Sequence, residues 1–314
     1  MKNTSFYKIE IEPDKNRRID QLIAAELPEY SRSRIKSWIN NQNITINGKA
    51  CSPKDKISKK STIEIKILEN EELDIKPQKI NLDIQYEDKD LLIINKKSGM
   101  VTHTAPGHYE STLQNALLYH YPDLRKVPRA GIIHRLDKNT SGLIIIARNL
   151  ISHNLLVKKM KDKLIKKKYI AFVTGLVEKN QIINNKIGRH RINRLKMAIS
   201  NSGKEAISKI KVLEKFERSS FLDIELITGR THQIRVHLSS LGHPIFGDDL
   251  YGFKKNMHKY NKKLINFLDS YPYHALHAYY LCFNHPITKK KVIINSKTPE
   301  TFDTIKSLLL NNYG

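Results

Sequence analysis

The sequence has few cysteines and few acidic residues: two and 31, respectively, among 314 residues. Cys51 and Cys282 are isolated, which excludes a disulfide framework or a cysteine-rich zinc site and fits a reducing cytosol. No apolar run approaches the roughly 20 residues that span a bilayer. The first 18 residues lack the apolar segment of a signal peptide. We therefore expect a cytoplasmic protein with no membrane partner.

Common cofactor and nucleophile motifs are also missing. The chain has no GxxxxGK[ST] loop and no strand–GxGxxG–helix unit, so it lacks the usual sequence evidence for nucleotide or dinucleotide binding. It has neither a GxSxG elbow nor a papain-type Cys-His signature. We expect no cofactor, and the candidate chemistry must come from other side chains.

Basic residues, in contrast, are abundant: 55 lysines and arginines give a formal net charge of +24. Such an excess favours a polyanionic partner, with nucleic acid the first candidate. The chain is also rich in Lys, Ile and Asn, and many lysines only solvate a surface. The positions of the arginines are therefore more informative than the total charge.

Residues 1–76 are predicted to form a small α+β domain. Apolar residues at helical spacing over 19–27 end at Pro28, and a basic helix with the apolar stripe Ile35, Trp38 and Ile39 follows. Asn47-Gly48 then marks a two-residue hairpin, and an alternating strand closes the unit. The cations of the basic helix either bind phosphates or only solvate its surface: Arg32, Arg34 and Lys36.

Residues 80–314 are predicted to form a second, larger domain, joined to the first by a charged linker that extends to about residue 80. Many short strands without regular βαβ alternation indicate an α+β fold around a mixed or antiparallel sheet. We expect a strand over GIIH, residues 131–134. Residues 253–272 read as a polar, irregular surface excursion.

A group of charges interrupts the apolar pattern in HRLDKNTSGLIIIAR, residues 134–148. Asp137 lies where a strand-like run meets a turn, a place where sheets often present functional groups. An aspartate before Asn-Thr-Ser-Gly also commonly caps its own turn. The position alone therefore leaves a turn residue and a catalytic carboxylate open. Arg135 and Lys138 would favour the ionised form.

Four basic side chains crowd one strand-like or short helical stretch of residues 229–252: Arg230, His232, Arg235 and His237. The two histidines are five residues apart with no carboxylate between them, so we expect no metal site here. Arginine in this setting suits a carboxylate or a phosphate. An arginine beside Asp137 would keep that carboxylate charged inside a pocket, where a lone aspartate tends to become neutral.

Tyr169 follows three lysines at the start of the predicted strand KKKYIAFVTG, residues 166–175. Most tyrosines in such positions belong to a core or an interface. In a basic cleft the same ring is also a platform for a flipped nucleobase.

Together these segments resemble the RluA family of RNA pseudouridine synthases along nearly the whole chain. SRSRIKSWI with ITINGK is similar to an S4 RNA-binding domain, and GIIHRLDKNTSGLIIIAR to the family's catalytic motif, with its aspartate at Asp137. KKYIAFVTG carries the family tyrosine at Tyr169, and GRTHQIRVHLSSLGHPIFGDDLYG the arginine motif, with its aspartate-pairing member at Arg235. The chain departs from the family where loop prolines are replaced, in NKK at 95–97 and HT at 103–104.

The resemblance implies an isomerase that converts specific uridines of large-subunit (23S) ribosomal RNA to pseudouridine. The N1–C1′ bond breaks, the base rotates, and C5 joins C1′, with no cofactor. Asp137 attacks C1′ or abstracts the C2′ proton, Arg235 keeps it ionised, and Tyr169 packs against the uracil and helps remove the C5 proton. Arg135 fills the space that the flipped uridine leaves. The expected RNA contacts are Arg135, His134, Arg32, Arg34, Lys36, Arg230 and His232.

The expected substrate is a hairpin loop of that RNA, free or within a pre-ribosomal particle, because base flipping costs least in a loop. We expect a monomer. Two other functions stay open: a non-catalytic rRNA-binding ribosome-assembly factor, and a synthase that acts on tRNA. A nucleoside hydrolase is disfavoured, because it would need a second acid and a metal or water site.

Overall fold

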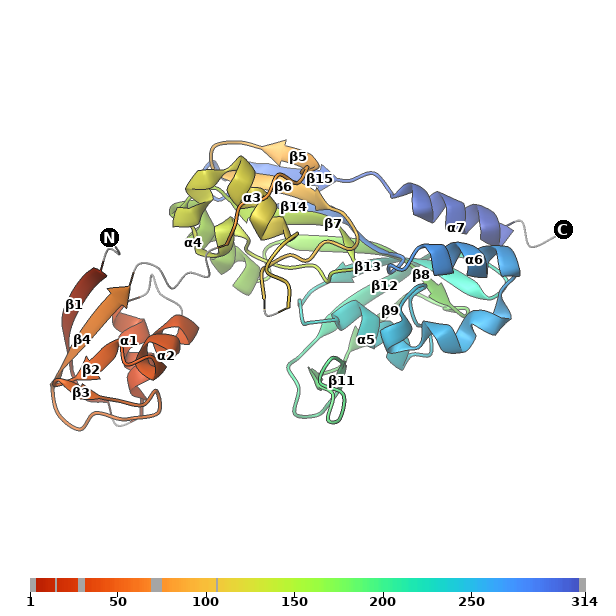
Figure 1. The fold of residues 1–314 in the computed structure, drawn as a ribbon. Helices are drawn as coiled ribbons and strands as arrows, with labels where there is room; N and C mark the ends of the chain where they lie inside the picture. Colours follow the sequence, from red (N-terminus) through yellow and green to blue (C-terminus); the bar gives the residue numbers. More distant parts are fainter. Residues whose placement is uncertain (1–3, 15, 28–31, 69–74, 106, 311–314) are drawn as a thin grey trace. The chain divides into compact units, whose positions relative to one another are not determined.

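The computed structural model describes residues 4–14, 16–27, 32–68, 75–105 and 107–310 (Figure 1). The chain divides into two compact units, Met1–Asp74 and Ile75–Gly314. The two units are described one after the other.

The strands of the N-terminal unit form an antiparallel sheet in the order β1 (Thr4–Ile11), β4 (Ser61–Leu68), β2 (Ile44–Ile46) and β3 (Lys49–Ala50). Figure 1 shows two helices on one side of this sheet, α1 (Ile19–Glu26) and α2 (Arg32–Asn40). The predicted stripe of α2 is confirmed, because its apolar members are buried between helices and sheet. At the β2–β3 turn, Asn47 and Gly48 both have positive φ (50° and 74°), as a two-residue hairpin requires.

The sheet of the second unit has the order β5 (Ile84–Glu87), β6 (Leu91–Lys96), β7 (Ser141–Ala147), β14 (Leu276–Asn284), β8 (Lys166–Thr174), β13 (Ser219–Leu226), β12 (Ile207–Lys215) and β9 (Gln181–Asn184). A ninth strand, β15 (Lys291–Asn295), also pairs with β14. Only the β7–β14 pairing is parallel among these strands. The predicted α+β fold with a mixed sheet is confirmed. Strand β7 is buried throughout, which is why its sequence is continuously apolar from Leu143 to Ala147.

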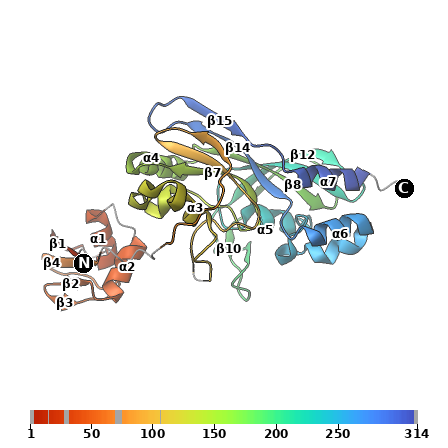
Figure 2. The ribbon, with the colours of Figure 1, turned by 45° about the horizontal axis from the view of Figure 1, so that its top comes forward.

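The α-helices of the second unit are α3 (Leu113–His120), α4 (Leu150–Lys161), α5 (Gln233–Ser240), α6 (Lys262–Ser270) and α7 (Glu300–Leu310). The 3₁₀ turns are η1 (Pro122–Lys126), η2 (Pro128–Gly131), η3 (Asp249–Tyr251) and η4 (Phe253–Lys259). A separate hairpin, β10 (Ile187–Arg189) and β11 (Met197–Ile199), stands apart from the main sheet (Figure 2). Residues 76–80 lie against α3, since Asn115 donates to the Lys76 carbonyl and His120 contacts that of Ile80.

Two expectations from the sequence are wrong. Residues 131–134 do not form a strand: η2 ends at Gly131, and Ile132 alone makes a bridge, to Ile146. Gly131 has a positive φ of 76°, outside the β region, and it follows left-handed backbone at Arg129 and Ala130 (φ 57° and 51°).

Residues 253–272 are not an irregular excursion either. They contain η4 and α6, and their apolar side chains are buried in the main core: Phe253, Tyr260, Leu264 and Leu268. The last three recur every four residues, a helical stripe that the surrounding lysines and asparagines obscure.

Gly142 sets the close pairing of β7 with β14 beside the Asp137 turn. Its φ is 121°, and a Cβ at this position would come within 2.4 Å of the Ala278 carbonyl oxygen. A larger residue would push the two strands apart just where the turn leaves the sheet.

Candidate active site

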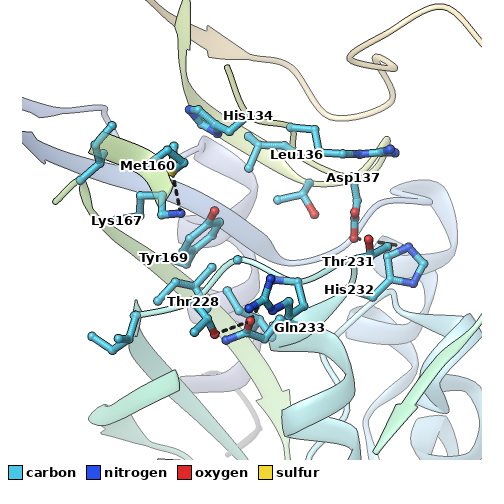
Figure 3. Close-up of a pocket in the computed structure, with 18 of the residues that line it drawn as sticks. His134, Leu136, Asp137, Met160, Lys167, Tyr169, Thr228, Thr231, His232 and Gln233 are labelled. Carbon is cyan, nitrogen blue, oxygen red and sulfur yellow. Dashed lines mark hydrogen bonds and ion pairs between the residues drawn. The ribbon is translucent and has the colours of Figure 1, made fainter. Parts of the chain in front are cut away.

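A cavity of about 500 Å³ lies where the turn before β7, strand β8 and the start of α5 meet (Figure 3). Such a volume is typical of a small-ligand site. Its apolar wall includes Ile133, Leu136, Ile165, Leu226, Ile234 and Leu276. Its basic side chains include Arg135, Lys161, Lys163, Lys167 and Arg230. The cavity therefore suits an anionic ligand that carries an apolar ring.

Asp137 is held by the backbone of its own turn. Thr140 N–H donates to the Asp137 carbonyl (3.1 Å), and the Thr102 hydroxyl donates to that of Leu136 (2.9 Å). The carboxylate is about one-fifth exposed, so it borders the cavity without being sealed from it. Figure 3 shows Asp137 and His232 on one side of the cavity, with Lys167 and Tyr169 on the other.

Lys96 fastens this turn to the end of β6. Its buried ammonium donates to the carbonyls of Met100 (2.9 Å), Lys97 (2.8 Å) and Lys138 (3.2 Å), the last being the residue after Asp137. Three carbonyls match the three donors of an ammonium. Burial lowers the pKa of Lys96 to about 7, an effect that the nearby Asp137 carboxylate opposes.

Arg235, on α5, joins two carboxylates. Its Nη1 donates to Asp137 Oδ2 (2.9 Å), while Nε and Nη2 donate to Asp248 (2.7 and 2.9 Å). Asp248 is fully buried and Arg235 nearly so. Burial opposes the charge of Arg235, but its hydrogen bonds and ion pairs with the two carboxylates prevail and raise its pKa. The guanidinium is therefore a fixed cation aimed at Asp137.

Tyr251 and His232 complete the frame around this ion pair. The Arg235 guanidinium lies 4.8 Å from the centre of the Tyr251 ring, and the Tyr251 hydroxyl lies 2.8 Å from His232 Nδ1. His232 Nε2 lies 3.8 Å from Asp137 Oδ2. Burial lowers the pKa of His232, although the nearby Asp137 carboxylate opposes this effect, so His232 is neutral at pH 7. Its ring forms part of the wall of the site and adds no charge to it.

Tyr169, on β8, is largely buried and forms part of the cavity wall. Burial, and then the charge of Asp137, raise the pKa of Tyr169, so the phenol keeps its proton at neutral pH. Lys167 lies two residues before Tyr169 on β8, so its side chain is on the same face of the strand. Its Nζ contacts Met160 Sδ (3.5 Å), and burial lowers its pKa to about 8.

The other predicted contacts in this unit line the same cavity. Arg135 and Arg230 are exposed cations, and Arg230 Nε donates to the Glu205 carbonyl (2.9 Å). His134, in contrast, is not a cation. Its Nε2 accepts from the Ile145 backbone N–H (3.0 Å), and burial lowers its pKa to about 3. His134 is therefore a neutral structural residue and offers no charge to a phosphate.

The predicted contacts of the N-terminal unit are partly engaged inside it. Arg32 and Lys36 approach the fully buried carboxylate of Asp20 at 2.8 and 3.5 Å, and Arg18 approaches it at 3.4 Å. Burial opposes the charge of Asp20, but these cations lower its pKa overall. Three cations around one carboxylate still leave a positive surface. The side chain of Arg34 lies outside the described residues.

Three residues of this site were not predicted from the sequence: Lys96, Asp248 and Tyr251. Lys96 was noted only within NKK at 95–97, where the chain departs from the family motif. Asp248 is one of two adjacent aspartates in GDDLYG. One local signal could have drawn attention to Asp248: the tight turn in GDDLYG, in which the Asp248 side chain caps η3. Nothing local, however, indicates that this carboxylate reaches Arg235.

One group of possible metal ligands occurs in the described part of the chain: Asp88, Asp90 and His285, outside the cavity. His285 Nδ1 accepts from the backbone N–H groups of Ile287 and Thr288, so Nε2 carries the proton and donates to Asp88 (2.9 Å). With that proton in place Nε2 is not available as a metal ligand, and His285 and Asp88 form a hydrogen-bonded pair.

Within the described ranges, every helix is too short or too polar to cross a bilayer.

The fold agrees with comparisons to known proteins. Residues 90–240 match the RNA pseudouridylate synthase family, and residues 17–63 match the S4 domain. The chain is 40% identical over 293 residues to ribosomal large subunit pseudouridine synthase D of Pseudomonas aeruginosa, covering 93% of this chain and 92% of that protein. It is also 40% identical over 273 residues to the protein of the same name from Escherichia coli, covering 86% and 84%.

A solved structure, human RNA pseudouridylate synthase domain containing 1, has a TM-score of 0.55 and 29% identity, covering 70% of this chain and 84% of that one. The chain therefore belongs to the RNA pseudouridylate synthase family and carries an S4 domain at its N-terminal end. It is an RNA pseudouridine synthase, an isomerase.

Proposed function

We propose that this enzyme converts uridines of large-subunit (23S) ribosomal RNA to pseudouridine. The observation that carries the proposal is the 2.9 Å ion pair of Arg235 with Asp137 at the edge of a basic cavity of nucleoside size. The named activity of the relatives supports this choice of RNA, and so does the S4 domain.

The carboxylate of Asp137 is the reacting group. Cleavage of the N1–C1′ bond develops positive charge on the ribose, which a nearby carboxylate stabilises. Asp137 then either bonds to C1′ or takes the C2′ proton. Arg235 keeps Asp137 ionised and aimed, because its other two donors are fixed on Asp248.

The remaining wall positions the base. Tyr169 packs against the flipped uracil as a neutral phenol. Because its pKa is raised, a phenolate that removes the C5 proton is scarce at pH 7, and packing is its main role. The apolar residues exclude water, which would otherwise capture the ribose and release the base. Arg135, exposed at the cavity, fills the gap left in the RNA stack.

The substrate is a hairpin loop, in which unpaired bases flip at least cost. The enzyme acts in the cytoplasm as a monomer, on free rRNA or on a pre-ribosomal particle. Exposed cations on both units bind the phosphates.

The test uses large-subunit rRNA transcript tritiated at uridine C5, because forming the C5–C1′ bond releases that tritium to water. Wild type is expected to release it, and Asp137→Asn to release none while binding the RNA nearly as well. Asp123→Asn is the matched control, since its side chain is 93% exposed and is not part of the cavity lining.

Three outcomes contradict parts of the proposal. Release from tRNA but not from rRNA keeps the chemistry and changes the substrate. Tight rRNA binding without release from any RNA favours an assembly factor. Near-normal release by Asp137→Asn removes Asp137 from the mechanism.

A further inference from the structure

Three consecutive lysines open strand β8, and their side chains alternate between the two faces of the sheet. Lys166 Nζ lies 3.3 Å from a carboxylate oxygen of Glu225, and Lys168 Nζ lies 3.2 Å from one of Asp223. Lys167 points the other way, into the cavity (Figure 3). Within the described residues, no carboxylate lies at ion-pair distance from its ammonium, so the middle lysine differs from both of its neighbours.

The ammonium of Lys167 is partly withdrawn from water and poorly paired. Among the described residues its hydrogen-bond contact is with Met160 Sδ, at 3.5 Å, and a thioether is a weak acceptor. The loop before α5 also borders it, because a Cβ added to Gly229 would lie 3.4 Å from Lys167 Nζ. Burial lowers the pKa of Lys167 to about 8, since desolvation of an unpaired ammonium is unfavourable. Such a cation in a cavity is typical of a site that a ligand oxygen completes.

Lys167 lies at the end of the cavity away from Asp137. The charge of Asp137 contributes to the raised pKa of Tyr169, whereas burial accounts for the lowered pKa of Lys167. Figure 3 shows the same order, with Tyr169 between Asp137 and Lys167. A uridine whose C1′ faces Asp137 and whose ring packs on Tyr169 therefore directs the edge opposite N1 toward Lys167. In a pyrimidine C4 lies opposite N1, so the group that uracil presents there is the carbonyl oxygen O4.

We propose that Lys167 is a further catalytic residue, whose ammonium donates a hydrogen bond to uracil O4 and stabilises the detached base. When the N1–C1′ bond breaks, its electron pair leaves with N1, and the negative charge spreads through the ring to O2 and O4. The ribose is then bonded to Asp137 or has given it the C2′ proton, so the carboxylate loses the charge that the base gains. Lys167 keeps its proton and holds the anion until C5 attacks C1′.

The same contact distinguishes uracil from cytosine. An ammonium is a donor only, and cytosine presents the N4 amino donor where uracil presents O4. The inference rests on the proposed function in that the base is a uridine of the substrate RNA, but it does not depend on which RNA carries that uridine. A phosphate fits Lys167 less well, because the exposed Arg135 and Arg230 border the same cavity, whereas Lys167 is partly buried.

The other titratable groups on the elements around Lys167 come from the turn before β7, the end of α4, strand β8 and the loop before α5: His134, Lys161, Lys163, Tyr169 and Arg230. The pKa of His134 is lowered to about 3 and that of Tyr169 is raised, so neither changes its charge near pH 8. The other three are exposed cations.

The test compares Lys167→Met with Lys166→Met in the full-length chain, on the tritiated transcript that the wild type converts. Lys167→Met is expected to lower the single-turnover rate of tritium release by roughly 100-fold or more, as loss of one oxyanion donor does, with little change in RNA affinity. Lys167→Arg, which keeps a donor and a charge, is expected to recover part of the rate. Lys166→Met removes the same charge from the opposite face and is expected to match the wild type. A rate for Lys167→Met equal to that of this control overturns the proposal.

Two further readouts separate this role from a structural one and from a phosphate contact. The melting temperature of Lys167→Met is expected to equal or exceed that of the wild type, because methionine removes an unpaired ammonium from a partly buried position. A marked fall assigns Lys167 to the fold and overturns the proposal. Weaker RNA binding at an unchanged single-turnover rate assigns Lys167 to a phosphate and also overturns it.

The pH dependence of kcat/KM reports the ionisation of the free enzyme. In the wild type it is expected to fall as pH rises above about 8, where Lys167 loses its ammonium, and this fall should be absent in Lys167→Met. A rise over the same range that disappears in Lys167→Met assigns the neutral amine as a base and overturns the proposal. The proposed function is judged by tritium release from rRNA in the wild type. Lys167 is judged by the variant relative to the wild type on one RNA, so the two fail independently.

Discussion

The site geometry predicts a large loss of activity when Arg235 is replaced by lysine. Its guanidinium makes three charge-assisted hydrogen bonds to two carboxylates, and only a planar fork reaches both. In Arg235→Lys the ammonium remains a cation, but it cannot hold Asp248 bidentately and still meet Asp137. One charge-assisted bond contributes about 1.5–3 kcal/mol. If the bond to Asp137 is the one lost in the transition state, kcat/KM falls by roughly 10- to 150-fold.

The same change should lower stability. Asp248 is fully buried, and losing one of its two bonds to Arg235 costs another ~1.5–3 kcal/mol. In a unit of this size each kcal/mol lowers the melting temperature by about 2–4 °C.

Tritium release under kcat/KM conditions and thermal unfolding are measured on the same preparations. Arg125→Lys is the control, because it makes the same substitution at an exposed position outside the cavity lining. If Arg235→Lys retains both the kcat/KM and the melting temperature of the wild type, the fork is not what aims Asp137.

Further predictions concern the fold and its pH dependence. Gly142→Ala should cost about 3 kcal/mol or more, because its Cβ meets the Ala278 backbone, whereas Gly242→Ala, with positive φ but open space, should cost ~1 kcal/mol in urea unfolding. Removal of residues 1–76 should weaken rRNA binding and lower its salt slope while leaving tritium release measurable; an unchanged slope would show that the N-terminal unit does not touch phosphates. Acidification should destabilise the second unit as pH falls from about 6.5 toward 4, because buried neutral histidines bind protons only on unfolding and each pKa unit corresponds to ~1.4 kcal/mol. Melting curves across pH test this, and a flat profile would contradict the burial-lowered pKa values of about 4, 3, 4 and 4 at His103, His134, His274 and His277.

Features that depend on neighbours in the chain could be predicted from the sequence. The turn at Asn47-Gly48 needs only two residues that accept positive φ, and the stripe of α2 follows from helical spacing. The position of Asp137 at a turn follows from the polar residues that separate two apolar segments. The same local reasoning was wrong at residues 131–134, because the positive φ of Gly131, which follows left-handed backbone at Arg129 and Ala130, cannot be read from an apolar run.

The tertiary structure decided the contacts that give these residues their chemistry. Arg235 meets Asp137 across 98 positions of sequence, and Lys96 reaches the Lys138 carbonyl across 42. Such pairs form only when α5 and the end of β6 both pack against the turn that holds Asp137 and Lys138, and no local sequence pattern encodes that packing. Asp248 is the clearest case: it is one of two adjacent aspartates, and only burial beside Arg235 distinguishes it. The sequence alone determined which residue types are available, and packing determined which of them touch, because ion-pair strength depends on separation and burial rather than on spacing along the chain.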